Sequence, residues 1–162
     1  MRKTIILFML VFAMLAAGVV SADVRKERRK FYRSIMKKGK ITFEDASKVL
    51  YMLKFDKFPD SDFAATSKEL AEAGVPAADD LEKDGEINRG ELSYMLVRAL
   101  KIKGGLKMRL GIKNERYCYR ELVFMKLMAA GNQRRKISGA ELIGIFDKCS
   151  EYRSKKDGEK DN

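Results

Sequence analysis

The side chains of this chain offer few of the groups that enzymes usually employ. The sequence contains no histidine, which removes the most common general base and the most common metal ligand. Without histidine, a nucleophile would need a lysine or a carboxylate as its activator. The three acids with defined positions in the sequence pattern, Asp45, Glu91 and Glu141, are each explained by helix capping, as argued below. We therefore expect no catalytic residues and no enzymatic activity.

Cys118 and Cys149 are the two cysteines of the chain. In an oxidising compartment outside the cytoplasm they would be able to form a disulfide. Both also fall on apolar positions of expected helices, where two buried thiols would serve equally well. The sequence leaves both interpretations open.

One acidic stretch carries oxygen ligands at spacings suited to calcium. Residues 80–91 resemble the twelve-residue EF-hand loop, whose first, third, fifth and twelfth positions are here Asp80, Glu82, Asp84 and Glu91. The segment before the loop departs from that family, because Gly74 and Pro76 end the incoming helix early. We therefore expect no metal or other cofactor, and interpret the stretch as a solvated loop with a turn at Asp84-Gly85. A calcium-binding protein is the alternative.

The first residues have the layout of a secretory signal peptide. Arg2 and Lys3 form a charged start, residues 5–20 form an apolar run, and Val20-Ser21-Ala22 is a small-residue cleavage site. The sequence predicts a signal peptide over residues 1–22 and a mature chain of 140 residues that begins at Asp23. A retained membrane anchor is the competing interpretation, for which the apolar run is short. The expected location is the periplasm or the cell surface.

The chain is strongly basic. Removing Arg2 and Lys3 with the signal peptide takes the formal charge from +11 to +9. Such a charge favours polyanionic partners: an anionic envelope polymer, lipid headgroups at a peripheral membrane contact, or nucleic acid. Export makes nucleic acid the weakest of the three, and we expect none as a partner. A charge that serves solubility alone is the simpler alternative.

A short motif occurs three times, beginning at Ile41, Ile87 and Ile137, with spacings of 46 and 50 residues. A helix-capping residue follows each isoleucine, and an acid follows three residues later, which is the pattern of a capping box. The predicted pairs are Thr42 with Asp45, Asn88 with Glu91, and Ser138 with Glu141. Apolar residues then recur at matched helical offsets, such as Leu50, Leu96 and Phe146. The repeat is the main organisational signal in the sequence.

Each motif follows another helical segment that ends near a glycine. These segments are residues 27–38 before Gly39, residues 61–73 before Gly74 and residues 115–130 before Gly131. We expect an all-α domain over residues 23–153, with three helix–loop–helix repeats (about 25–54, 61–100 and 115–152) around one core. The alternation of apolar and basic residues near 105–112 predicts one short extended segment. The charged tail, residues 154–162, is predicted to be disordered.

The middle repeat resembles the S-layer homology (SLH) domain. Residues 70–75, Leu-Ala-Glu-Ala-Gly-Val, match the family's helix end, and residues 87–91, Ile-Asn-Arg-Gly-Glu, match its Ile-Thr-Arg-Ala-Glu motif. Residues 95–100, Met-Leu-Val-Arg-Ala-Leu, match the helix that follows. The resemblance implies three repeats around a pseudo-threefold axis, with grooves between repeats that bind anionic wall polymer. It extends over residues 31–149 and is weaker in the outer repeats.

The resemblance also implies that the motif arginine contacts the polymer. Arg89 occupies that position in the middle repeat, whereas Phe43 and Gly139 stand there in the others. The competing interpretation of Arg89 is an exposed residue in the first turn of a helix. The sequence thus predicts an exported, non-catalytic envelope protein that contacts an anionic polymer such as cell wall or peptidoglycan. Arg89 would be the direct contact, and residues 25–40 and 101–113 would add longer-range attraction. A periplasmic scaffold that binds an envelope protein, without a small ligand, is a further alternative.

Overall fold

The computed structural model describes residues 25–60, 62–76, 83–111 and 114–159. The predicted signal peptide, residues 1–22, lies outside this part of the chain. Within the part described, no helix has both the length and the apolar character needed to cross a bilayer. The chain divides into two compact units, Met1–Ser34 and Ile35–Asn162, and each is considered by itself.

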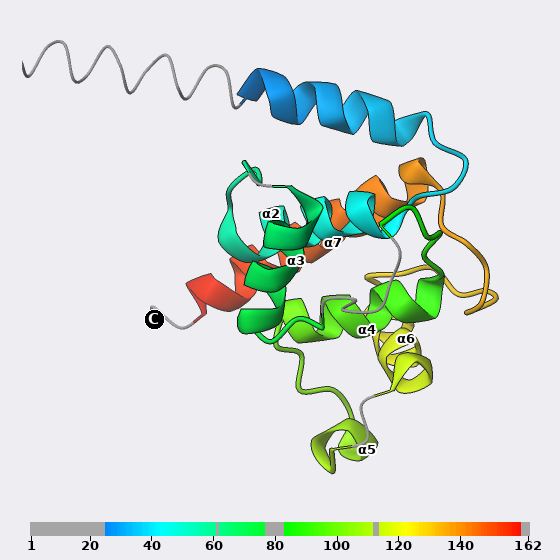
Figure 1. Ribbon diagram of the computed structural model, residues 1–162. Helices are drawn as coiled ribbons and strands as arrows, with labels where there is room; N and C mark the ends of the chain where they lie inside the picture. Colours follow the sequence, from blue (N-terminus) through cyan, green and yellow to red (C-terminus); the bar gives the residue numbers. More distant parts are fainter. Residues whose placement is uncertain (1–24, 61, 77–82, 112–113, 160–162) are drawn as a thin grey trace, which may run out of the picture. The chain divides into compact units, whose positions relative to one another are not determined.

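The second unit contains six helices in the described residues (Figure 1). They are α2 (Phe43–Phe55), α3 (Phe63–Glu72), α4 (Arg89–Ala99), α5 (Leu106–Arg109), α6 (Glu115–Phe124) and α7 (Gly139–Gly158). The only β-type pairings in these residues are two isolated bridges, Thr42 with Glu86 and Asn88 with Lys136. The prediction of an all-α fold is therefore confirmed.

The three motif helices α2, α4 and α7 each begin with a capping side chain. Thr42 accepts a hydrogen bond from the Asp45 N–H, and the Asp45 carboxylate accepts from the Thr42 N–H, which completes a capping box. Asn88 and Glu91 form the same reciprocal pair at α4. Capping satisfies backbone N–H groups that have no partner inside the helix. The predicted capping boxes at α2 and α4 are confirmed.

The three motif isoleucines meet in a closed ring of backbone hydrogen bonds. The Ile41 N–H donates to the Ile137 carbonyl at 3.0 Å, the Ile137 N–H to the Ile87 carbonyl at 3.4 Å, and the Ile87 N–H to the Ile41 carbonyl at 3.2 Å. All three side chains are completely buried. Because each segment donates to one neighbour and accepts from the other, the three segments are related in a cyclic manner. We call this arrangement the isoleucine ring.

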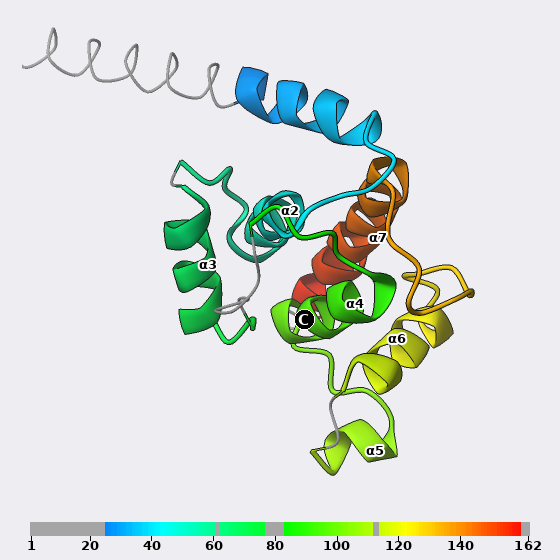
Figure 2. The ribbon, with the colours of Figure 1, turned by 45° about the vertical axis from the view of Figure 1, so that its right-hand side comes forward.

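The remaining helices pack against the motif helices. Helix α3 lies against α2, α6 lies against α4, and α2 also contacts α4 and α7, as Figures 1 and 2 show from two sides. The core between them consists of aliphatic side chains from every repeat, with 2% or less of their surface exposed. Its largest members are Ile35, Ile41, Leu50, Leu70, Ile87, Leu92, Leu96, Leu122, Ile137 and Leu142.

Three helices end in the same way, with a left-handed residue followed by a buried apolar one. Gly74 (φ 77°) ends α3, Lys101 (φ 50°) ends α4 and Lys126 (φ 60°) ends α6. In each case the next residue donates its N–H to a carbonyl five positions back, which is the Schellman pattern. The prediction that the third repeat's first helix runs to residue 130 is therefore wrong, because Lys126 adopts this conformation without being a glycine.

The predicted extended segment near residues 105–112 is also wrong. Residues 106–109 form the short helix α5, which begins after Gly104 (φ 65°) and packs on α6. Met108 is buried against this neighbour, whereas Leu106 and Leu110 are exposed. The alternating pattern therefore reflects one short helix with an apolar outer side.

The predicted disordered tail is helical over most of its length. Helix α7 continues to Gly158, and its last turns are held against the unit by two basic side chains. Lys156 Nζ donates to the Leu100 carbonyl at 2.9 Å, and Arg153 donates to the Leu53 carbonyl and to the Asp56 carboxylate. These long-range contacts stabilise a segment whose own composition is too polar to do so.

Candidate functional site

Arg89, the predicted polymer contact, lies inside the protein at the start of α4. Only 5% of the residue is exposed. Its Nε donates to the Glu141 carboxylate at 2.7 Å, and one terminal nitrogen donates to the Ala129 carbonyl at 3.3 Å and the Tyr119 hydroxyl at 3.5 Å. Both interpretations from the sequence, a polymer contact and an exposed first-turn residue, require solvent access. The structure therefore corrects them: Arg89 is a buried structural residue.

Glu141 completes this buried cluster. Its backbone N–H donates to the Ser138 hydroxyl at 3.3 Å, so Ser138 caps α7 as predicted. Its carboxylate does not return to the Ser138 N–H, and accepts instead from Arg89 and, at 2.5 Å, from Arg135. The predicted capping box at α7 is thus only half present. The Glu141 carboxylate forms an ion pair with Arg89 of the middle repeat in place of the hydrogen bond that would complete the capping box.

The position equivalent to Arg89 is buried in the other two repeats as well. Phe43 is 3% exposed and belongs to the core. Gly139 lies against backbone, where an added Cβ would come within 1.7 Å of the Ile35 carbonyl oxygen. None of the three positions can therefore reach a polymer at the surface, and the SLH-type contact residue has no exposed counterpart here.

The residues of the acidic loop are only partly described. Asp80 and Glu82 lie outside the described residues, whereas Asp84 is exposed. The Glu91 carboxylate accepts the Asn88 N–H at 2.7 Å and so serves the cap of α4. In the parts of the chain that the structure describes, no three His, Cys, Asp or Glu side chains are grouped to hold a metal ion. The calcium alternative thus stays a prediction.

Cys118 and Cys149 are not joined by a disulfide in the structure, and both are completely buried. Burial raises the pKa of the Cys149 thiol to about 12. A thiol with such a pKa is almost entirely protonated at neutral pH and is a poor nucleophile. Of the two interpretations from the sequence, the structure therefore shows the buried thiols and not the disulfide.

The described part of the first unit is a basic helix with a long exposed surface. Residues 25–34 are all helical, and residues 25–30, 33 and 34 are exposed. Arg25, Arg29 and Arg33 are four residues apart and therefore share one side of the helix, about 6 Å from one to the next. Lys26 and Lys30 form a second row beside them, and Glu27 is paired with Lys30 at 2.9 Å. Such a surface can bind repeated negative charges along a polymer.

A second exposed surface was not expected from the sequence. It surrounds α5 and α6, where Leu106, Leu110 and Phe124 expose most of their side chains. The sequence signal for this surface is the run of alternating apolar and basic residues after Gly104-Gly105, which predicts an extended segment and forms α5 instead.

Comparison of the chain with protein-family models, with curated proteins and with solved structures finds no match. The structure itself defines the class of protein: an all-α domain with three capped motif helices, whose first segments are joined by the isoleucine ring. The resemblance to SLH domains rests on the motifs of the sequence.

Proposed function

We propose that this protein is an exported, non-catalytic component of the cell envelope that binds an anionic envelope polymer, such as cell wall. The single observation that carries the proposal is the exposed basic helix of residues 25–34, with its row of Arg25, Arg29 and Arg33. The formal charge supports it, since it remains +9 after Arg2 and Lys3 are removed from the +11 of the full chain, and long-range attraction then favours a polyanion over other ligands. The apolar run and cleavage site in residues 1–22 support export.

The SLH resemblance contributes architecture and not a contact residue. Three repeats joined in a cyclic manner agree with what that resemblance implies, whereas the buried Arg89 does not. We therefore assign polymer binding to the basic helix. Binding of this kind is electrostatic, follows the density of negative charge and weakens as salt is added.

The proposal is tested by sedimentation of the mature protein with purified sacculi over a series of salt concentrations. Each charge contact makes the dependence of affinity on salt steeper, because binding releases counterions from the polymer. The triple variant Arg25→Gln, Arg29→Gln, Arg33→Gln should therefore bind more weakly and with a shallower salt dependence. A charge-matched control is Lys57→Gln, Lys68→Gln, Lys148→Gln, which removes three exposed lysines of the second unit.

The control should keep most of the affinity and of its salt dependence. Equal losses in both triple variants would show that only net charge matters, and would remove the basic helix as the site. No sedimentation of the native protein at low salt would refute polymer binding as such.

A further inference from the structure

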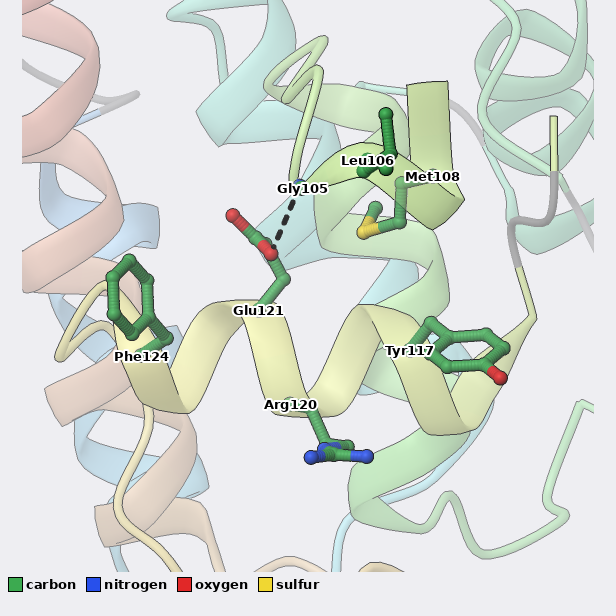
Figure 3. A pocket seen from close by; sticks show the side chains of 7 residues that line it. All are labelled: Gly105, Leu106, Met108, Tyr117, Arg120, Glu121 and Phe124. Carbon is green, nitrogen blue, oxygen red and sulfur yellow. Dashed lines mark hydrogen bonds between the residues drawn. The ribbon is translucent and has the colours of Figure 1, made fainter. Parts of the chain in front are cut away.

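The surface around α5 combines exposed apolar side chains with a hollow. Leu106, Leu110 and Phe124 are 74%, 72% and 83% exposed, respectively. Leu106 is the first residue of α5, and Leu110, four positions later, is the residue that follows its end. A pocket of about 440 Å³ lies between α5 and α6, and its lining includes Leu106, Met108, Tyr117 and Phe124 (Figure 3). Three large apolar side chains are thus exposed on two adjacent elements; we call them the apolar patch, and exposed apolar surface of this kind often marks an interaction site.

Basic side chains surround a second hollow on the other flank of α5. This pocket, of about 350 Å³, is lined by four of them: Lys101, Lys103, Arg109 and Lys156. Arg109 donates through Nε to the Gly104 carbonyl at 3.2 Å, which leaves the far end of its guanidinium without a hydrogen-bond partner in the described residues. Lys156 has part of its donor capacity engaged by the Leu100 and Lys101 carbonyls. The pocket is therefore cationic and has donors to offer an anion.

A third hollow, of about 380 Å³, shares Lys101 and Lys103 with this pocket and adds Arg98. The Nε of Arg98 is buried and has no hydrogen-bond partner among the described residues. Burial, and then the positive charge of Lys101, lower the pKa of Lys54. Arg98 donates through a terminal nitrogen to the Tyr94 hydroxyl at 3.0 Å, so its guanidinium is held beside these lysines and adds to the positive charge of this surface.

One acid near α5, Glu121, offsets part of this positive charge. Glu121 lines both flanking pockets, and its carboxylate accepts the Gly105 N–H at 3.2 Å, as the dashed line in Figure 3 shows. Arg116 and Arg120 on α6 are exposed and add further positive charge. We call the whole region, the apolar patch with its cationic flank, the α5 surface.

We propose that the α5 surface docks on an anionic phospholipid bilayer, with Leu106, Leu110 and Phe124 entering the headgroup–acyl boundary and the cationic flank binding lipid phosphates. Apolar side chains bordered by lysine and arginine are the composition of surfaces that lie on anionic membranes. A second copy of the chain is disfavoured as the occupant, because two equally basic surfaces would repel each other. Figures 1 and 2 both place α5 beyond α4 and α6, at the end of the second unit farthest from α2, where a flat bilayer can reach it. This inference does not depend on polymer binding by the basic helix.

The chain contains no tryptophan, so one introduced residue can report the docking. The variant Phe124→Trp places an indole on α6, in the lining of the pocket between α5 and α6. Its emission should shift to the blue when the mature protein is mixed with vesicles of phosphatidylglycerol and phosphatidylcholine, because the ring leaves water. Vesicles of phosphatidylcholine alone, or inorganic phosphate, should produce no shift. The matched control is Phe55→Trp on α2, whose emission should not change.

The role of the cationic flank is tested by charge removal in the Phe124→Trp background. The variant Lys101→Gln, Lys103→Gln, Arg109→Gln should bind anionic vesicles on the order of 100-fold more weakly. The control that replaces Lys57, Lys68 and Lys148 by glutamine should bind within a few-fold of the parent. Equal losses in the two triple variants, or vesicle binding without an emission shift, would overturn the proposal. So would a shift produced only by an acidic protein partner.

The two proposals fail separately. Replacing Arg25, Arg29 and Arg33 should weaken sacculus binding and leave the Phe124→Trp shift intact. A loss of the shift in that variant would mean that the basic helix, and not the α5 surface, brings the protein to lipid.

Discussion

Replacing Glu141 by glutamine tests whether Arg89 is a structural residue. The substitution retains the size of the side chain and one acceptor oxygen, so the packing is preserved and the negative charge is lost. Arg89, with a side chain 6% exposed, would then face a neutral amide oxygen in place of the carboxylate, and its other contacts, the Ala129 carbonyl at 3.3 Å and the Tyr119 hydroxyl at 3.5 Å, are long. Leaving one charge of a buried pair without its partner costs about 3–5 kcal/mol. Because the Glu141 side chain is 17% exposed, we expect about 3 kcal/mol.

Removing the other partner should cost less. In Arg89→Met the Glu141 carboxylate keeps Arg135, which lies at 2.5 Å and is half exposed, so the remaining charge is still paired. We expect a loss of about 1–2 kcal/mol from the contacts of Arg89 alone. The variant that carries both Arg89→Met and Glu141→Gln should lose about 1–3 kcal/mol less unfolding free energy than the sum of the losses in the two single variants.

Urea unfolding followed by far-ultraviolet circular dichroism measures all three free energies, provided that the slopes stay equal. If Glu141→Gln lost less than about 1 kcal/mol, or Arg89→Met lost more than Glu141→Gln, the account of Arg89 as a buried, paired cation would be refuted.

Three further outcomes follow from backbone geometry and burial. Gly139→Ala should destabilise the protein by at least about 3 kcal/mol, since its Cβ would meet the Ile35 carbonyl, whereas Gly144→Ala in the same helix has open space and should gain about 0.5–1 kcal/mol in urea unfolding. Lys126→Gly should raise the midpoint of thermal unfolding, with a gain of up to about 1 kcal/mol, because a left-handed residue with a side chain becomes a glycine. Cys149 should react with a thiol reagent only after unfolding. Its contribution to stability is fully present below pH 9.0, the ordinary thiol pKa, and is lost as pH rises from there through about 12, which titration of stability against pH will show.

The sequence predicts those parts of the fold that depend on neighbouring residues. Thr42 with Asp45 and Asn88 with Glu91 are three positions apart, so their hydrogen bonds depend only on the local helix start. Glycine positions do not predict the end of α6, because Lys126, and not a glycine, adopts the left-handed conformation there. A better marker was spacing: Leu122 to Leu127 repeats the interval from Leu70 to Val75, with a buried apolar residue at each end.

The site was harder to predict because it depends on contacts across the chain. Whether Arg89 is exposed is decided by Glu141, 52 residues away, and by the loop that carries Ala129. In the sequence, Arg89 fits the SLH-type motif and Glu141 fits a capping box, so neither pattern indicates that the two side chains form an ion pair. One signal was present, since Gly139 takes the place of a side chain in the first turn of a helix, and a glycine there marks close approach of another segment.

The isoleucine ring fixes the number of repeats. In an open repeat array each repeat packs only on its two neighbours, and the repeats at the two ends keep one unpaired surface where further copies can be added. Here the Ile41 N–H already donates to the last segment, so neither end has a vacant position. Adding a fourth repeat would require breaking one hydrogen bond of the isoleucine ring. Longer loops between the repeats would leave the ring intact, so we expect insertions in the loops to be tolerated better than a fourth repeat.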